Sequence, residues 1–134
     1  MRDPARLEVL ERCAELAVLV YRVTASFPAS EKYGLASQMR RAVVSVGSNI
    51  AEGCGMATGA AFLRYLNIAT GSLLELDYQA MLASRLALGD AETLADVRAL
   101  ALRAKQMLSR LRSSVRANPS DHRGTRRPPN PPLR

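Results

Sequence analysis

Several residue types are scarce in this chain of 134 residues, and each scarcity excludes a class of protein. Tryptophan is absent, aromatic residues make up 4% of the chain, and only two cysteines occur, which is too few for a disulfide scaffold. The single histidine, His122, leaves too few nitrogen and sulfur ligands for a zinc site. We expect no metal and no cofactor, and free thiols at Cys13 and Cys54 in a reducing cytoplasm.

Long apolar runs are also missing from the sequence. No stretch approaches the roughly 20 apolar residues that cross a bilayer. No apolar segment follows the charged residues at the N-terminus, as it would in a secretory signal peptide. We expect a cytoplasmic protein without a membrane partner.

Apolar residues recur at steps of three and four, which predicts helices. No alternating strand pattern competes, so the expected fold is all-α, an up-and-down antiparallel four-helix bundle over residues 1–117. The four predicted core stripes are Leu7, Leu10, Ala14, Ala17, Val20 or Tyr21, Thr24 and Phe27; Leu35, Met39, Ala42, Val43, Val46 and Ile50; Phe62, Tyr65, Ala69, Leu73, Leu76 and Ala80, then Leu86 or Leu88; and Leu94, Val97, Ala101, Ala104, Leu108, Leu111 and Val115.

Capping residues and helix breakers set the expected helix ends. The predicted N-caps are Asp3, Ser30, Thr58 and Asp90, and the predicted stops are Pro28, Gly53 and Gly89. Gly53 and Gly55 offer left-handed C-cap positions. After residue 117 the periodicity ends, and residues 118–134 form a Pro- and Arg-rich stretch that we expect to be a disordered tail.

The second and third helices carry a polar stripe beside the apolar one. Small residues in it would let the two helices approach closely, and Arg41 could pair with Glu75 across them. This polar seam is interpreted as a structural device that fixes helix register or an oligomer contact, with a binding cleft as the alternative. Its residues are Arg41, Ser45, Asn49, Glu52, Ser72 and Glu75.

The segment from Phe27 to Glu75 carries a resemblance to a known family. Its matching pieces are Phe27-Pro28, Glu31, Tyr33-Gly34-Leu35, Gln38, Arg40-Arg41-Ala42, Ser48-Asn49-Ile50-Ala51-Glu52-Gly53, Phe62, Tyr65-Leu66, Ile68-Ala69, Gly71-Ser72-Leu73 and Glu75. The chain resembles the 23S rRNA intervening-sequence protein family, a bacterial four-helix-bundle family, over about residues 7 to 115. The resemblance implies a homo-oligomer, with a pentamer favoured. A related branch comprises accessory proteins of diversity-generating retroelements, which bind nucleic acid and work with a reverse transcriptase.

The charge balance is strongly positive, with a formal net charge of +7. Arginine supplies nearly all of it, and guanidinium groups pair well with phosphate, although GC-rich codon usage gives the same bias. Basic residues line the fourth helix, where they could follow a nucleic-acid backbone with little sequence preference. The candidate contacts are Arg98, Arg103, Lys105, Arg110, Arg112 and Arg116, with Arg40 and Arg64 as secondary candidates.

Alternatives to nucleic-acid binding remain for this basic helix. It could be a solvated face, or it could form ion pairs with Glu8, Glu11 or Glu15 of the first helix. It could also be the docking surface of a scaffold for a protein partner, such as the reverse transcriptase of a diversity-generating retroelement. Glu52 and Glu75 lack an accompanying nucleophile or metal cluster, so we expect neither an enzyme nor a small-molecule substrate.

Overall fold

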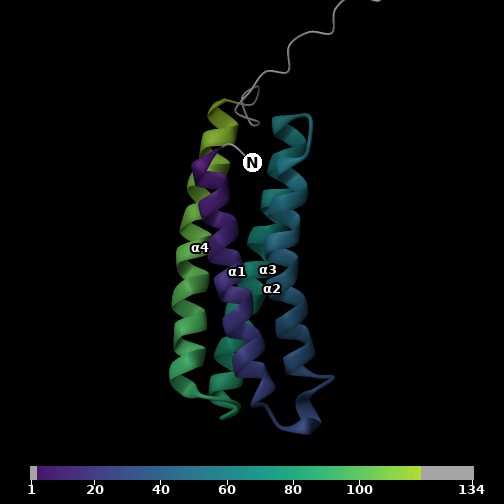
Figure 1. Cartoon of the computed structure of the whole chain (residues 1–134), viewed down its shortest axis with the longest axis vertical. Helices are drawn as coiled ribbons and strands as arrows, with labels where there is room; N and C mark the ends of the chain where they lie inside the picture. Colours follow the sequence, from purple (N-terminus) through teal and green to yellow (C-terminus); the bar gives the residue numbers. More distant parts are fainter. Residues whose placement is uncertain (1–2, 119–134) are drawn as a thin grey trace, which may run out of the picture.

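The computed structural model describes residues 3–118, which form an up-and-down, antiparallel four-helix bundle (Figure 1). The predicted all-α fold is confirmed. The expected tail, which includes His122, lies outside the described residues except for Asn118. The elements are α1 (Pro4–Ala25), a 3-10 turn η1 (Ala29–Glu31), α2 (Leu35–Cys54), α3 (Gly59–Arg85) and α4 (Ala91–Ala117).

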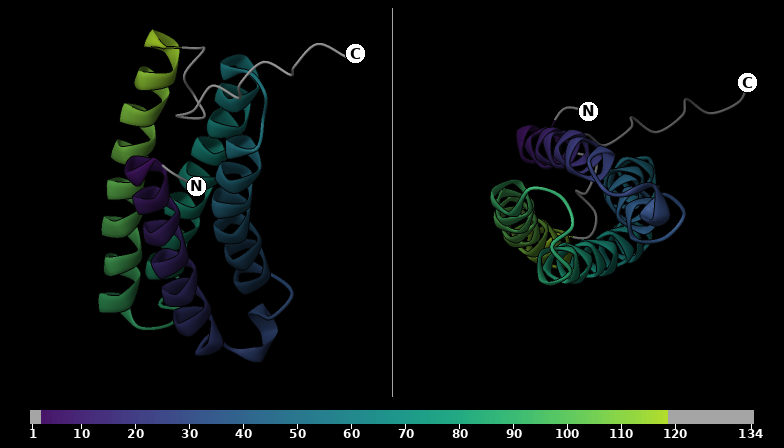
Figure 2. Two further views of the ribbon diagram at one scale, coloured as in Figure 1. Left: turned by 45° about the horizontal axis from the view of Figure 1, so that its top comes forward. Right: turned by 90° about the horizontal axis from the view of Figure 1, so that it is seen from below.

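The helices surround one core in chain order. Contacts join α1 to α2, α2 to α3 and α3 to α4, and α1 closes the ring by packing against α4. The view along the bundle shows this ring (Figure 2). Because the helices alternate in direction, the connection between α1 and α2 lies at one end of the bundle, and the C-terminal half of α4 lies at the other (Figure 1).

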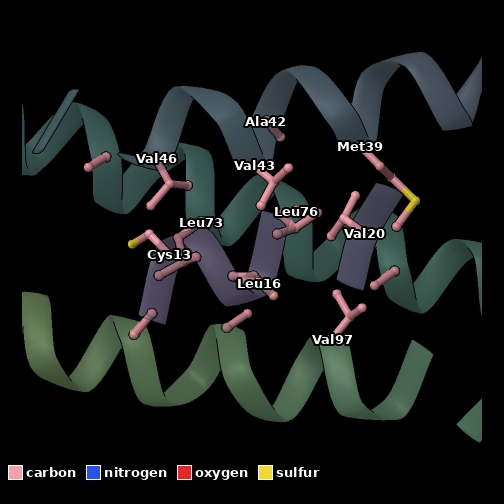
Figure 3. Packing of buried hydrophobic residues seen from close by; sticks show 14 of the residues in the cluster. Cys13, Leu16, Val20, Met39, Ala42, Val43, Val46, Leu73, Leu76 and Val97 are labelled. Atoms are coloured by element: carbon pink, nitrogen blue, oxygen red, sulfur yellow. The ribbon is translucent and has the colours of Figure 1, made fainter. Parts of the chain in front are cut away.

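Aliphatic side chains from all the helices meet inside the ring. Cys13, Leu16 and Val20 of α1 face inward toward residues of the other three helices, among them Val97 of α4 (Figure 3). All seven residues of the predicted α4 stripe are buried. The predicted stripe of α2 is buried as well, from Leu35 to Ile50.

The predicted core face is confirmed at Val20, Thr24 and Phe27 but is wrong over the earlier part of α1. Leu7, Ala14 and Tyr21 are exposed, and the buried apolar residues are Val9, Cys13, Leu16, Val20 and Val23. Helix α1 is apolar around much of its circumference, so helical periodicity is compatible with two overlapping apolar stripes and does not decide which of them is buried. The stripe that is buried contains the bulkier side chains, which remove more apolar surface from water than Ala14 and Ala17 would.

Arg6 also belongs to the buried face of α1, and only 5% of its surface is exposed. Its guanidinium carbon lies 4.6 Å from the centre of the Phe62 ring, and its Nε lies 3.4 Å from the Oδ2 of Asp3. A cation–π contact and an ion pair therefore hold a charged side chain against the core.

The N-terminus of α2 differs from the prediction. Ser30 lies within η1, and α2 begins at Leu35, whose backbone N–H donates to the Glu31 carboxylate at 3.1 Å. The predicted caps Asp3, Thr58 and Asp90 are confirmed, since each side chain accepts a hydrogen bond from the first turn of its helix.

The predicted left-handed cap at the end of α2 is also wrong. Gly53 is the penultimate residue of the helix, and Gly55 has a right-handed φ of −84°. An added Cβ at Gly53 would lie 2.8 Å from the Tyr65 Cβ and 2.9 Å from the Phe62 ring. Gly53 is therefore needed for the close approach of α2 and α3.

Helix α3 ends at Arg85, and the chain then turns through two residues with positive φ, Ala87 at 55° and Gly89 at 68°. The predicted stop at Gly89 is therefore about four residues late, because the helix has already ended when Ala87 adopts the left-handed conformation. Most of the predicted α3 stripe is buried, namely Phe62, Ala69, Leu73, Leu76 and Ala80. Tyr65 is only half-buried, and Leu86 is exposed.

Candidate nucleic-acid interface

Six basic residues occur on α4, against two acids, Glu92 and Asp96. The helical periodicity divides most of them between the two edges of the helix. Arg98, Lys105 and Arg112 lie on the edge next to α3, whereas Arg103 and Arg110 lie toward α1. From Lys105 to the end of the helix there are four basic residues and no acid. We call this segment the basic half of α4.

Two cations on the α3 edge are held by polar groups of α3. The Nε of Arg98 lies 3.0 Å from the Oδ1 of Asp77, and both side chains are substantially exposed. Arg112 donates from Nη1 to the Oδ1 of Asn67 at 3.2 Å and to the Oγ1 of Thr70 at 3.4 Å. These contacts fix the direction of both guanidinium groups before any ligand binds.

The ion pairs between α4 and the acids of α1, which were one alternative for the basic helix, do not form within residues 3–118. Glu15 pairs with Arg12 inside α1, at 2.8 Å. Arg110 and Glu8 line the same hollow between α1 and α4, of about 380 Å³, but no hydrogen bond or ion pair joins them. Arg103 and Lys105 are exposed. The basic half of α4 is therefore only lightly neutralised by its neighbours.

A second hollow, of about 390 Å³, separates α3 from α4 on the outside of the bundle. Leu74 and Leu102 line it together with Arg98 and Lys105. Both leucines are about half exposed, at 49% and 55%. Apolar side chains thus interrupt the cations along this edge, which is typical of a surface that contacts protein.

The polar seam lies along the outer edge where α2 meets α3. The hydroxyls of Ser45 and Ser72 are 2.9 Å apart, and the Asn49 amide donates to the Ser45 carbonyl and hydroxyl at 2.8 and 3.0 Å. These three residues are half-buried, so the seam joins the two helices at this level.

The remaining seam residues are exposed, and the expected Arg41–Glu75 pair does not form between these described residues. Glu75 instead accepts from the Nε2 of Gln79 at 3.2 Å. Arg41 and Glu52 face solvent at different levels of α2. Only the three-residue centre of the predicted seam is therefore brought together by hydrogen bonds.

Arg40 and Arg41 contribute to a hollow that the sequence did not indicate. It is an open depression of about 540 Å³ between α1 and α2, at the end of the bundle that carries η1. Tyr21, Lys32 and Tyr33 line it with the two arginines, and Ser37, Val44 and Ser45 complete it. We call it the α1–α2 hollow.

The sequence analysis missed the tyrosines of this hollow because periodicity assigned Tyr21 to the core, and Tyr33 lies in a turn without a pattern. The only signal was the local density of Lys32, Tyr33, Arg40 and Arg41 on either side of a helix start. Arg64, the other secondary candidate, is exposed on α3 and does not line the hollow.

Neither cysteine is set up as a nucleophile. Burial raises the pKa of the Cys13 thiol to about 11. Burial also raises the pKa of the Cys54 thiol, although the nearby Arg6 charge opposes that shift. No group of three or more metal-binding side chains gathers within residues 3–118, and no helix there is long and apolar enough to cross a membrane.

Comparison with known proteins decides the family. The sequence model of the 23S rRNA-intervening sequence proteins matches residues 5–110, which is most of the chain. The chain belongs to this family. A search of the curated proteins finds no match.

One solved structure has the same fold as this intervening-sequence family protein. It is a protein of unknown function from the S23 ribosomal protein family of Bacteroides thetaiotaomicron, with 22% sequence identity and a TM-score of 0.75. The match covers 81% of this chain and 98% of the other. At this identity the likeness establishes the four-helix architecture alone.

The family match bears differently on the two basic regions of this intervening-sequence family protein. The α1–α2 hollow, from Tyr21 to Ser45, lies wholly within the matched residues 5–110. The basic half of α4 extends past them, because Arg112 and Arg116 follow residue 110.

Proposed function

We propose that this protein is a homo-oligomer that binds the backbone of structured RNA or DNA and carries out no catalytic step. The observation that supports the proposal is the charge of the basic half of α4. Four cations follow one another there with no acid, and only Arg112 donates hydrogen bonds to α3. Such a face attracts phosphates without reading bases.

The state of the thiols supports the absence of a catalytic step that uses a cysteine nucleophile. A nucleophilic cysteine needs a lowered pKa, and burial raises the pKa of both cysteines here. Thiols with raised pKa values also suit a reducing compartment, so the proposal includes a cytoplasmic location.

Exposed apolar side chains on the α3–α4 side support self-association. Leu74 and Leu102 are 49% and 55% exposed, and both line the hollow between α3 and α4. Packing such a face against a second copy would remove this surface from water. A pentamer is the favoured assembly because of the family resemblance. Light scattering on a sizing column tests the assembly, and a monomer at micromolar concentration refutes it.

Nucleic-acid binding is tested by titrating labelled structured RNA and duplex DNA at two salt concentrations. We expect binding that weakens steeply with salt, because each phosphate contact releases counterions. The Arg110→Gln/Arg116→Gln variant should weaken binding to every sequence and flatten the salt dependence by about one unit per contact. The Arg12→Gln/Arg85→Gln variant removes the same charge elsewhere and serves as the control. Absence of binding at low salt contradicts the proposal.

A protein-interaction scaffold is the second candidate, supported by the apolar hollow between α3 and α4. Its partner could be a polymerase, such as the reverse transcriptase of a diversity-generating retroelement. A pull-down from nuclease-treated lysate separates the two functions. A partner that stays bound after nuclease treatment and is lost in Leu74→Ser/Leu102→Ser favours the scaffold.

A further inference from the structure

The turn between η1 and α2 is held by hydrogen bonds, although its largest side chain packs against little. Successive backbone hydrogen bonds build it, from Glu31 N–H to Pro28 O at 2.9 Å and from Gly34 N–H to Glu31 O at 3.1 Å. The Glu31 carboxylate then accepts from Leu35 N–H. Yet the Tyr33 side chain on this turn is 87% exposed. A fixed backbone therefore presents an aromatic ring to solvent.

Cations line the same hollow as this ring. The Nζ of Lys32 lies 5.5 Å from the centre of the Tyr33 ring, and the exposed Arg41 also lines the α1–α2 hollow. No carboxylate lines the hollow. Glu31, the acid in the neighbouring turn, is bonded to the start of α2. The hollow consequently combines a positive field with an open aromatic face.

Arg40 is fixed within the hollow. Its Nε donates to the Thr24 hydroxyl at 2.9 Å, its Nη2 donates to the Tyr21 carbonyl at 3.4 Å, and its guanidinium carbon lies 4.6 Å from the centre of the Tyr21 ring. Thr24 is a buried residue of α1 whose hydroxyl donates to the Val20 carbonyl, so the arginine is anchored to a fixed group. A guanidinium anchored in this way costs little entropy to use as a phosphate contact.

We infer that the α1–α2 hollow binds an unpaired nucleotide of a single-stranded nucleic acid, with its base on Tyr33. Its phosphates lie near the three cations of the hollow, which are Lys32, Arg40 and Arg41. Stacking on an aromatic ring requires a base that is free of its neighbours, so the site selects single strands over duplexes. Its volume of about 540 Å³ lies within the usual range for small-ligand sites. The inference rests on the proposed nucleic-acid function and adds a second site with a different preference.

A fluorescence experiment on the full chain tests the site directly. Because the protein has no tryptophan, the Tyr33→Trp variant carries a single reporter in the hollow. We expect an unstructured RNA 12-mer to quench its emission, because a base stacks on the indole. An abasic oligonucleotide of equal length should leave the emission unchanged. Equal quenching by both, or by neither, overturns the inference.

Affinity measurements supply the second test. Tyr33→Ala should weaken binding of the single-stranded 12-mer by about 5- to 150-fold, the usual effect of losing one base stack, and leave duplex RNA binding unchanged. Tyr33→Phe should retain most of the affinity. Tyr78→Ala, which removes an exposed tyrosine of α3 outside the hollow, is the matched control, with light scattering to confirm an unchanged assembly.

The outcomes separate this inference from the proposed function. If the wild-type protein binds neither RNA, both fail. If it binds both forms and Tyr33→Ala weakens neither, only the inference fails. If an acidic peptide displaces the RNA from the hollow with higher affinity, the occupant is a protein segment and the inference is again overturned.

Discussion

Arg98 on α4 and Asp77 on α3 form an ion pair across the contact between their helices, with the Arg98 Nε 3.0 Å from the Asp77 Oδ1. The pair is the one ion pair between helices within residues 3–118, and it lies on the edge of α4 that bears the proposed phosphate contacts. A carboxylate in that position competes with phosphate for the same guanidinium.

Replacing Asp77 should therefore strengthen nucleic-acid binding. In Asp77→Asn we expect higher affinity and a salt slope steeper by up to about one unit, because Arg98 becomes free to contact phosphate. The free energy of unfolding should change by less than about 1 kcal/mol, since exposed ion pairs contribute little. Asp96→Asn, which removes an α4 acid that has no ion pair, is the control. Equal affinity gains in the two variants would show that Arg98 is not a contact.

Gly53 and Gly71 should respond oppositely to alanine. At Gly53 the new methyl would meet the Tyr65 Cβ and the Phe62 ring at under 3 Å, so Gly53→Ala should destabilise the protein by about 1 to 3 kcal/mol. At Gly71 nothing lies within 4 Å, and Gly71→Ala should stabilise it by about 0.5 to 1 kcal/mol through helix propensity. Urea unfolding checks both. Stabilisation by Gly53→Ala would mean that α2 and α3 are further apart.

Asp90 should make the stability of α4 depend on pH. Hydrogen bonds from the side chain and the backbone of Thr93 lower the pKa of the Asp90 carboxyl. A lowered folded-state pKa means that this contribution is present above the ordinary aspartate pKa and is lost as the pH falls through the folded-state value. Asp90→Asn keeps an N-cap acceptor and removes this titration. Urea unfolding from pH 7 to pH 3 should show a smaller acid loss in the variant than in the wild type.

The two cysteines should differ in their reactivity toward thiol reagents. Cys13 is buried and its thiol has a pKa of about 11, so at pH 8 about one molecule in a thousand carries the thiolate. Cys54 is half-buried and should react first. Labelling kinetics of Cys13→Ser and Cys54→Ser assign the two phases. Faster labelling of Cys13 would indicate that α1 opens locally.

The fourth helix shows how far sequence periodicity reaches. Its core positions are apolar without a break and its other faces carry most of its charged residues, so its buried face was predicted in full. Helix α1 lacks this contrast. Its apolar residues surround the helix near Leu16, and the choice between faces depends on which side chains the other three helices can accommodate. Hydropathy also gives no reason to bury Arg6, whose place depends on the Phe62 ring of a distant helix.

The candidate sites were predicted less well than the fold, because they depend on contacts between segments. The seam residues of α2 and α3 follow from helical spacing, but the partner of Glu75 is Gln79 of the same helix and not Arg41. The acid that meets α4 comes from α3 and not from α1, because the α4 edge that carries Arg98 faces α3. The α1–α2 hollow needs the turn at η1 to bring Tyr33 beside the arginines, and periodicity does not describe turns.

The alternating direction of the helices has a consequence for ligand length. The connection between α1 and α2, beside which the α1–α2 hollow begins, lies at one end of the bundle, and α4 ends at the other (Figure 1). The 20 residues of α2 span roughly 30 Å at 1.5 Å per residue. That distance equals about nine steps of a strand in B-form geometry, at 3.4 Å per step. Within one chain the separation of the two proposed surfaces would therefore favour ligands above a certain length. A ligand much shorter than this would occupy one end only, and a longer one carrying both a duplex and a single-stranded overhang would gain the avidity of two points of attachment.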